Sequence, residues 1–183
     1  MSFQQNILDH YENIWKNKPK IYLWDKGKVE KMPHDFRILE FEPSASREMW
    51  TYSTCCMSNP DDENPIELHF FSSKKDTSLI ELLTTVVYFH RNTSRLNLWH
   101  TVNFGRPWQD KSHCDYGLIS LPYLDGSELE NLQEQTYKIK FYWLIPITKN
   151  EVEFKKNYGI EALELKFEEL DLDYTNPNRF TIS

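Results

Sequence analysis

The most constraining feature of this sequence is the run YKIKFYWLI at positions 137–145. In its first half, Lys138 and Lys140 alternate with apolar residues, whereas its second half is apolar at every position. A strand that is apolar on both faces must be covered from both sides. We therefore expect a central strand here, with residues 142–145 buried and with Pro146 ending it.

Further strands and helices are expected from the spacing of the apolar residues and from the turn residues between them. The additional strands are expected at residues 21–24, 36–41, 49–54, 66–71, 101–104 and 117–121. The helices are expected at residues 3–15, before Pro19, at residues 79–92, between Thr148 and Gly159, and at residues 160–170. The first four strands follow one another closely and should be connected as hairpins. These elements predict an α+β fold, with a mixed, largely antiparallel sheet flanked by helices.

Two of these helices carry a capping-box pattern, in which a Ser or Thr precedes a Glu by three residues. Ser78 with Glu81 predicts one helix start, and Thr148 with Glu151 predicts another. The segment 160–170 fits either a strand or a helix. We favour the helix because Ala, Leu, Glu and Lys are good helix formers.

The length of 183 residues suits one domain with a single core, so we expect no internal domain boundary within residues 1–183. No segment approaches the roughly 20 consecutive apolar residues of a membrane span, and the N-terminus does not resemble a signal peptide. The 3 cysteines are an odd number in a chain large enough to fold without disulfides, which fits a reducing compartment. We expect a cytoplasmic protein.

The net charge of −7 disfavours nucleic acid and anionic membranes as partners. Acidic residues gather in three clusters, at 61–67, 125–134 and 161–173, while lysines gather at 16–31. Charge runs are usually solvated faces, but several acidic clusters make a basic protein partner plausible. The expected partner-binding residues are acidic: Asp61, Asp62, Glu63, Glu161, Glu164, Glu168 and Glu169. On a helix, positions 161, 164 and 168 share one side, so their carboxylates should face solvent together.

No pattern of catalytic or metal-binding residues stands out. Cys55 and Cys56 are adjacent, so they point to opposite faces of a strand and cannot chelate one ion. His113, Cys114 and Asp115 could suggest a nucleophile with its base, but neighbouring residues rarely face each other correctly. We expect buried, inert thiols and a protein that is not an enzyme, with no catalytic residue, cofactor or metal.

Seven segments taken in order resemble the suppressor-of-fused (SUFU-like) domain family, over about residues 49–179. They are MWTYSTCCMS, IELHFF, LIELLTTVVYFH, TVNFGRPW, ISLPY, FYWLIPITKNEVEF and a final acidic helix. The family usually has a glycine before the Met-Ser pair, where this chain has Cys56. A glycine there would suit a turn. The presence of Cys56 therefore leaves the backbone conformation at this position open, but it does not argue against the fold.

The resemblance implies an α+β domain without enzymatic activity that binds other proteins. The short form of the chain looks like the bacterial members, which resemble immunity proteins or antitoxins. Such a protein would neutralise a basic toxin, for example a nuclease, whose phosphate-binding surface attracts acidic side chains. The alternative is a cytosolic adaptor that sequesters a signalling or transcription protein. An enzyme that uses His113 or His69 is a third possibility.

Overall fold

The computed structural model describes residues 2–23 and 31–182 of the chain. The expected strand at residues 21–24 therefore falls partly outside the described residues, because Trp24 is not among them. Among the described residues, no helix combines the length and the apolar character needed to cross a membrane.

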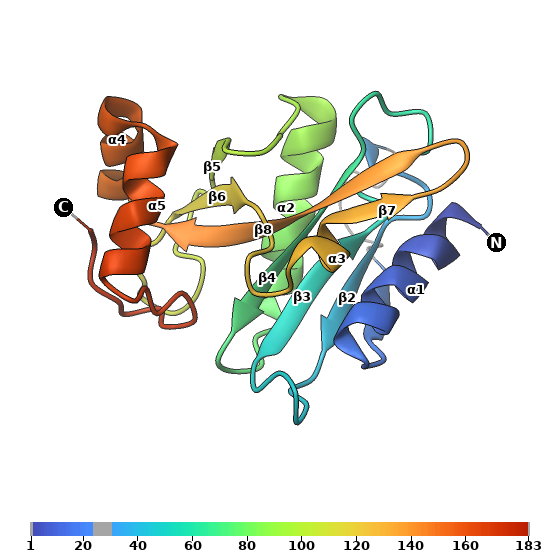
Figure 1. Cartoon of the computed structure of the whole chain (residues 1–183), viewed down its shortest axis with the longest axis horizontal. Coiled ribbons are helices and arrows are strands. Elements are labelled where there is room, and N and C mark those ends of the chain that lie inside the picture. The colour runs from blue at the N-terminus through green and yellow to red at the C-terminus, as the bar shows by residue number, and fades with distance from the viewer. Residues whose placement is uncertain (1, 24–30, 183) are drawn as a thin grey trace.

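The described residues form an α+β fold, as the sequence predicts (Figure 1). The helices are α1 (Phe3–Trp15), α2 (Ser78–Asn92), α3 (Ser127–Glu130), α4 (Lys149–Tyr158) and α5 (Ile160–Glu169). The strands are β1 (Lys20–Leu23), β2 (Arg37–Phe41), β3 (Trp50–Cys55), β4 (Ile66–Ser72), β5 (Thr101–Asn103), β6 (Tyr116–Ser120), β7 (Asn131–Gln133) and β8 (Lys138–Ile147). The sequence did not predict α3 and β7, which are both short.

The strands form one sheet in the order β1-β2-β3-β4-β8-β6-β5, and β7 also pairs with β8. The first four strands are antiparallel neighbours, as expected for hairpins. The pairing of β4 with β8 is parallel, and the other pairings are antiparallel. The sheet is therefore mixed and largely antiparallel.

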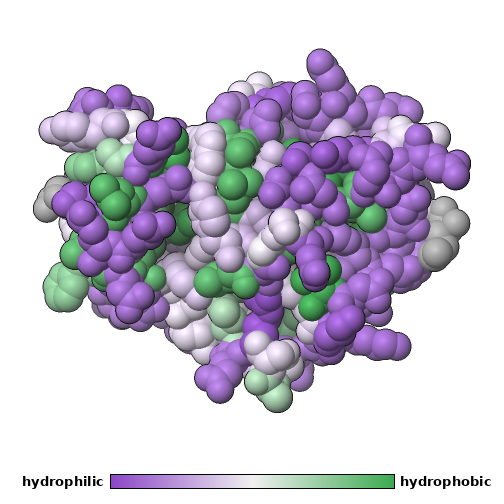
Figure 2. Space-filling view, in the orientation of Figure 1, coloured by the Kyte–Doolittle hydropathy of each residue, from purple (hydrophilic) through white to green (hydrophobic). Residues whose placement is uncertain are grey.

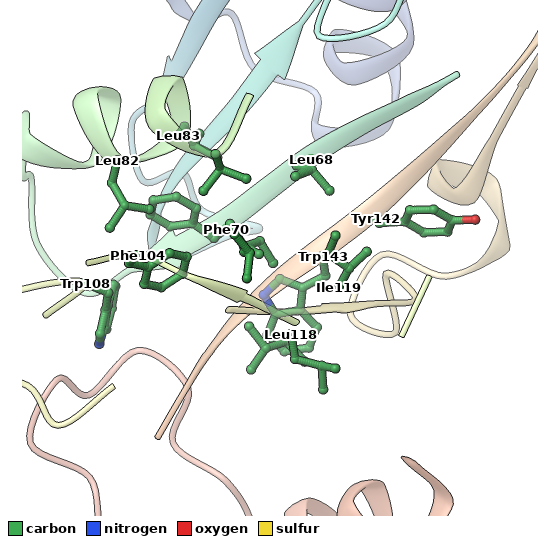
Figure 3. Close-up of a cluster of buried hydrophobic side chains, with 14 of the residues drawn as sticks. Leu68, Phe70, Leu82, Leu83, Phe104, Trp108, Leu118, Ile119, Tyr142 and Trp143 are labelled. Atoms are coloured by element: carbon green, nitrogen blue, oxygen red, sulfur yellow. The ribbon is translucent and has the colours of Figure 1, made fainter. Parts of the chain in front are cut away.

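Helices cover both faces of this sheet. On one face, Leu82 and Leu83 of α2 belong to the same buried cluster as Leu68 and Phe70 of β4 (Figure 3). On the other face, Tyr11 and Trp15 of α1 pack on Phe41 and Phe141. The strand β8 is buried on both faces over residues 142–145, which confirms the prediction of a central strand.

Pro146 does not end β8, contrary to the prediction. The strand continues to Ile147, and Pro146 pairs with Gly117 of β6. Because β4 pairs only with residues 140–143, β8 has no strand partner on that side at Pro146. The Pro146 carbonyl accepts a hydrogen bond from Arg179 instead. A proline is tolerated where its missing N–H would not join a ladder, so the strand does not break there.

The expected capping box at α4 is confirmed, whereas the one at α2 is wrong. Thr148 and Glu151 form both hydrogen bonds of the box. In α2, the residue before the helix is Thr77, and Ser78 donates its backbone N–H to the Asp76 carboxylate at 2.9 Å. Asp76 therefore takes the capping role that the pattern assigned to Ser78.

Candidate protein-binding groove

The helix α5 places an acidic side next to a groove. Gly159 has φ of 90°, a conformation that favours glycine, and separates α4 from α5. Leu163 of α5 is fully buried, which fixes the rotation of the helix on the protein. The following turns then bring Glu164, Phe167 and Glu168 to the mouth of the groove.

The groove has a volume of about 250 Å³ and is walled by α5, the end of β8, the loop after β6 and the segment after α5. The lining residues are Ser120, Tyr123, Leu124, Trp143, Ile145, Glu164, Phe167, Glu168, Asp171, Leu172 and Tyr174. Hydrophobic residues are visible on and beside α5 on the same face of the molecule (Figure 2). Large side chains are exposed on both walls: Leu165 of α5 is 55% exposed, and Tyr123 of the loop after β6 is 57% exposed.

Aromatic side chains form the floor of the groove. Trp143 pairs with Ser120 across β8 and β6, so both side chains lie on the same face of the sheet. The Tyr174 ring packs edge-on against Trp143, with ring centroids 4.7 Å apart. Trp143 is 6% exposed, so the floor is rigidly packed as well as apolar.

The loop after β6 forms the wall opposite α5. The Tyr123 hydroxyl donates a hydrogen bond of 2.9 Å to the Glu164 carboxylate and so bridges the two walls. Partial burial raises the pKa of Glu164, the Tyr123 hydrogen bond opposes this rise, and the like charges of Glu168 and Glu161 add to it. Burial and the same Glu164 carboxylate raise the pKa of Tyr123 to about 12. The carboxylates of Glu161 and Glu168 therefore repel the Glu164 carboxylate at the mouth of the groove.

The acidic residues predicted to bind a partner do not form one surface. Asp61, Asp62 and Glu63 lie in the loop between β3 and β4, at the opposite end of the molecule from α5 (Figure 1). Asp62 forms ion pairs with Arg91 and with Arg95. These pairs neutralise Asp62 and leave Asp61 and Glu63 as the exposed acids of that loop.

On α5, Glu161, Glu168 and Glu169 are exposed, and Glu169 pairs with Lys166 of the same helix at 3.3 Å. Of the three carboxylates expected to face solvent together, Glu161 and Glu168 are exposed, whereas Glu164 is only partly exposed and is hydrogen-bonded to Tyr123. The reason is Tyr123, which lies 41 residues earlier and closes over the helix.

Two further members of the acidic clusters are structural. Glu67 is fully buried and accepts hydrogen bonds from the hydroxyls of Thr54 and Ser58 and from the backbone N–H groups of Met57 and Ser58. Asp125, whose side chain is only 2% exposed, pairs with Arg47 and accepts from Trp15. The clusters that the sequence groups by charge are thus divided between the interior and the surface.

The aromatic residues of the groove were not predicted as a binding site. Trp143 was expected only as a core residue, and Tyr123 and Tyr174 lie in irregular segments. The one sequence signal was a tyrosine and a leucine directly after Pro122, in a turn where large apolar residues are not needed for a core.

The residues that could suggest enzyme chemistry lie apart from this groove. Burial raises the pKa of the Cys114 thiol, which is 1% exposed, and a thiol held protonated is a poor nucleophile. His69 is fully buried, and burial lowers its pKa to about 3. Among residues 2–23 and 31–182, no three His, Cys, Asp or Glu side chains come together in an arrangement that could hold a metal ion.

Comparisons with known proteins decide the family. The model of the suppressor of fused protein (SUFU) family matches residues 33–180. The chain belongs to the suppressor of fused family. A SUFU homologue from Neisseria gonorrhoeae FA 1090 has the same fold, with a TM-score of 0.86 and 31% sequence identity over 98% of this chain and 96% of that one. No curated protein sequence matches the chain.

Two more distant members share the fold of this SUFU-like domain. The protein in the Sufu–Fu complex matches with a TM-score of 0.67 and 15% identity, over 91% of this chain and 84% of that chain. Drosophila Suppressor of Fused matches with a TM-score of 0.62 and 13% identity, over 91% of this chain and 47% of that chain. This chain therefore spans about half of the Drosophila protein.

The position before Met57, where the resemblance implies a glycine, has an unusual backbone conformation. Cys56 occupies that position and has φ of 63°, in the left-handed region that favours glycine. Cys56 therefore adopts a backbone conformation that a glycine would adopt more easily, at the position where the resemblance implies a glycine.

Proposed function

We propose that this SUFU-like protein acts as a non-enzymatic domain in the cytoplasm, where it binds a basic protein partner through the groove beside α5. The single observation that carries this proposal is the composition of the groove, which combines an aromatic floor with three carboxylates at its mouth, from Glu164, Glu168 and Asp171. Protein interfaces favour aromatic residues at their centre, with polar residues around them.

We further propose that the partner is a toxin, which this protein neutralises as an antitoxin or immunity protein. A nuclease toxin needs a basic surface to hold phosphates, and the net charge of −7 would attract that surface over a long range. Such attraction speeds association, which matters for an inhibitor that must act before its target does damage.

An adaptor that sequesters a regulatory protein is the second candidate. The observation that favours it is the fold shared with Sufu in the Sufu–Fu complex, because that relative is bound to another protein. Both candidates require binding without turnover, and they differ only in what the partner does when it is free.

The test begins with capture of the partner from the native cell on the immobilised protein, followed by mass spectrometry. The captured protein is then expressed alone and together with this chain, and growth is measured. A toxin should arrest growth alone and allow growth in the presence of this chain. A partner that is harmless when free would exclude the toxin proposal and favour the adaptor, and a captured protein that is chemically altered by this chain would exclude a non-enzymatic role.

A further inference from the structure

The size of the groove limits what it can hold. Its volume of about 250 Å³ lies below the roughly 300 to 1,000 Å³ of small-molecule and cofactor sites. It does suit one large side chain of a protein partner. The chemistry of the lining then decides which side chain that is.

The lining is aromatic and acidic, with no basic residue. Trp143 and Tyr174 provide the aromatic floor, Tyr123 and Phe167 add aromatic side chains beside it, and the carboxylates stand at the mouth. No lysine, arginine or histidine lies among the described residues that line the groove. Aromatic faces and carboxylates both attract cations, and they do so more strongly where water is partly excluded.

A buried hydroxyl at the floor gives a second, independent indication. Ser120 is 1% exposed and lines the groove beside Trp143. Its Oγ atom has no hydrogen-bond partner within residues 2–23 and 31–182. An unpaired buried polar atom is costly, so a ligand that donates a hydrogen bond here gains more than an apolar one.

We propose that the groove receives an arginine side chain of the protein partner. The guanidinium lies against the aromatic walls and donates hydrogen bonds to the carboxylates of Glu164 and Glu168 and to the Ser120 hydroxyl. This inference rests on the proposed function, since it names the chemical anchor of the basic partner. It adds a specific requirement, because a basic surface without an accessible arginine would not fill the groove.

Arginine fits better than the other candidates. A leucine or phenylalanine side chain would cover Glu164 and Ser120 without offering either a donor, and this desolvation opposes binding. A lysine would supply charge, but its compact and strongly hydrated ammonium does not stack on rings. The guanidinium is planar, less hydrated and carries five donors, so it can contact the rings, the carboxylates and the hydroxyl together.

The test uses four short peptides, acetyl-Gly-X-Gly-amide, in which X is arginine, citrulline, lysine or leucine. Citrulline has nearly the shape of arginine without its charge. Each peptide is titrated into the intact isotope-labelled protein, and the indole resonance of Trp143 and the amide resonances are followed by NMR. We expect the arginine peptide to shift groove resonances at millimolar concentration and to bind at least tenfold more tightly than the citrulline and leucine peptides, and more tightly than lysine.

Three variants refine this measurement. Glu164→Gln and Ser120→Ala should each weaken binding of the arginine peptide severalfold, whereas binding of the leucine peptide should not be weakened. Glu153→Gln is the matched control, because Glu153 is an exposed carboxylate on the neighbouring helix α4, outside the groove. Binding of the arginine peptide should be unchanged in this control.

The proposal is overturned if the citrulline, lysine or leucine peptide binds as tightly as the arginine peptide, or if no peptide shifts groove resonances at tens of millimolar. It is also overturned if the arginine peptide shifts resonances elsewhere and those of the groove stay unchanged. The proposed function fails on a different result, namely a captured partner whose association does not depend on the acidic residues of α5. The two failures are therefore distinguishable.

Discussion

The indole nitrogen of Trp15 donates a hydrogen bond of 2.9 Å to the carboxylate of Asp125, which lies 110 residues further along the chain. Arg47 pairs with the same carboxylate, and its guanidinium lies over the Trp15 ring with 5.0 Å between Cζ and the ring centroid. Asp125 belongs to the loop that carries Tyr123 and Leu124, so these buried contacts with α1 fix one wall of the groove.

The first prediction concerns this anchor. Asp125→Asn keeps an acceptor for Trp15 but leaves the largely buried Arg47 without its counter-charge. Breaking a buried ion pair from one side costs about 3 to 5 kcal/mol. We expect a loss near the lower end of this range in urea denaturation, because the Arg47 side chain is still 14% exposed.

The double variant Arg47→Met with Asp125→Asn should recover part of that loss, since it removes both charges. Partner affinity should also fall in Asp125→Asn, because the loop that holds Tyr123 is no longer fixed. A single variant as stable as the wild type would mean that the ion pair does not hold the loop.

The second prediction concerns the central strand. Trp143 packs against Phe71 and Tyr174 and is 6% exposed. Truncation of a buried tryptophan to alanine costs about 3 to 5 kcal/mol, so Trp143→Ala should lower the thermal midpoint clearly. Tyr158→Ala is a suitable control because Tyr158 is 69% exposed. Equal midpoints for Trp143→Ala and the wild type would contradict the place of Trp143 in the core.

The third prediction is a pH dependence of stability. Burial, followed by the charge of Arg47, lowers the pKa of His69 to about 3 in the folded protein. In the unfolded chain the pKa is about 6.5, so between these values only the unfolded state binds the proton. Stability is therefore complete above the unfolded pKa and is lost as the pH falls, by up to about 1.4 kcal/mol per pH unit from this group.

Burial likewise lowers the pKa of His90 to about 4, so this residue adds a loss of the same sign. His69→Phe should make the decline of unfolding free energy below about pH 6 shallower by roughly 1.4 kcal/mol per unit. His34→Gln is the comparison variant at the surface, because the His34 side chain is 98% exposed. If the unfolding free energy of His69→Phe depends on pH as steeply as that of the wild type, His69 is not buried in its neutral form.

The fourth prediction concerns the turn at Cys56. A non-glycine residue in the left-handed region costs roughly 1 to 2 kcal/mol, and Cys56→Gly removes this cost. The same change removes a buried thiol and makes the unfolded chain more flexible. Both effects lower stability and so oppose the gain from relieving the backbone strain. We expect a net change within about 1 kcal/mol for this reason.

Cys55→Gly is the matched comparison. Cys55 is buried on strand β3, where an extended backbone gives glycine no advantage, so its replacement should cost about 2 kcal/mol or more. Equal losses for the two variants in urea denaturation would show that the left-handed turn at Cys56 is not strained.

The sequence predicted the main elements of the fold because their patterns are local. The alternation in β8 and the capping box of α4 depend on residues within a few positions of each other, and both are confirmed. The error at Pro146 arose because the effect of a missing N–H depends on the neighbouring strand. The pairing of β4 with β8 ends at Trp143 of β8. The residues around Pro146 do not reveal this end of the pairing.

The groove could be predicted only in part. The sequence identified the acidic character of α5, since Glu164 and Glu168 follow from helical spacing. It could not place Tyr123 against Glu164, because that contact depends on the fold of a loop in an irregular segment. For the same reason, the sequence grouped Asp125 with surface acids although Trp15 and Arg47 enclose it.

The last prediction tests whether α5 attracts a basic partner. The triple variant Glu161→Lys, Glu164→Lys and Glu168→Lys reverses the charge of this side of the helix, and association with the captured partner is measured at low and moderate salt. Because electrostatic attraction mainly speeds encounter, we expect a slower association that depends less on salt.

Reversal at Glu164 also removes the acceptor of the Tyr123 hydroxyl, so a small loss of stability is expected in the triple variant. In a matched variant, Asp61 and Glu63 are changed to lysine, which reverses the charge of the loop between β3 and β4 instead. We expect this second variant to associate nearly as fast as the wild type. If the α5 variant associates normally at both salt concentrations, the α5 side is a solvated face and the β3–β4 loop becomes the next candidate. If the loop variant is the slower of the two, the partner binds at the β3–β4 loop.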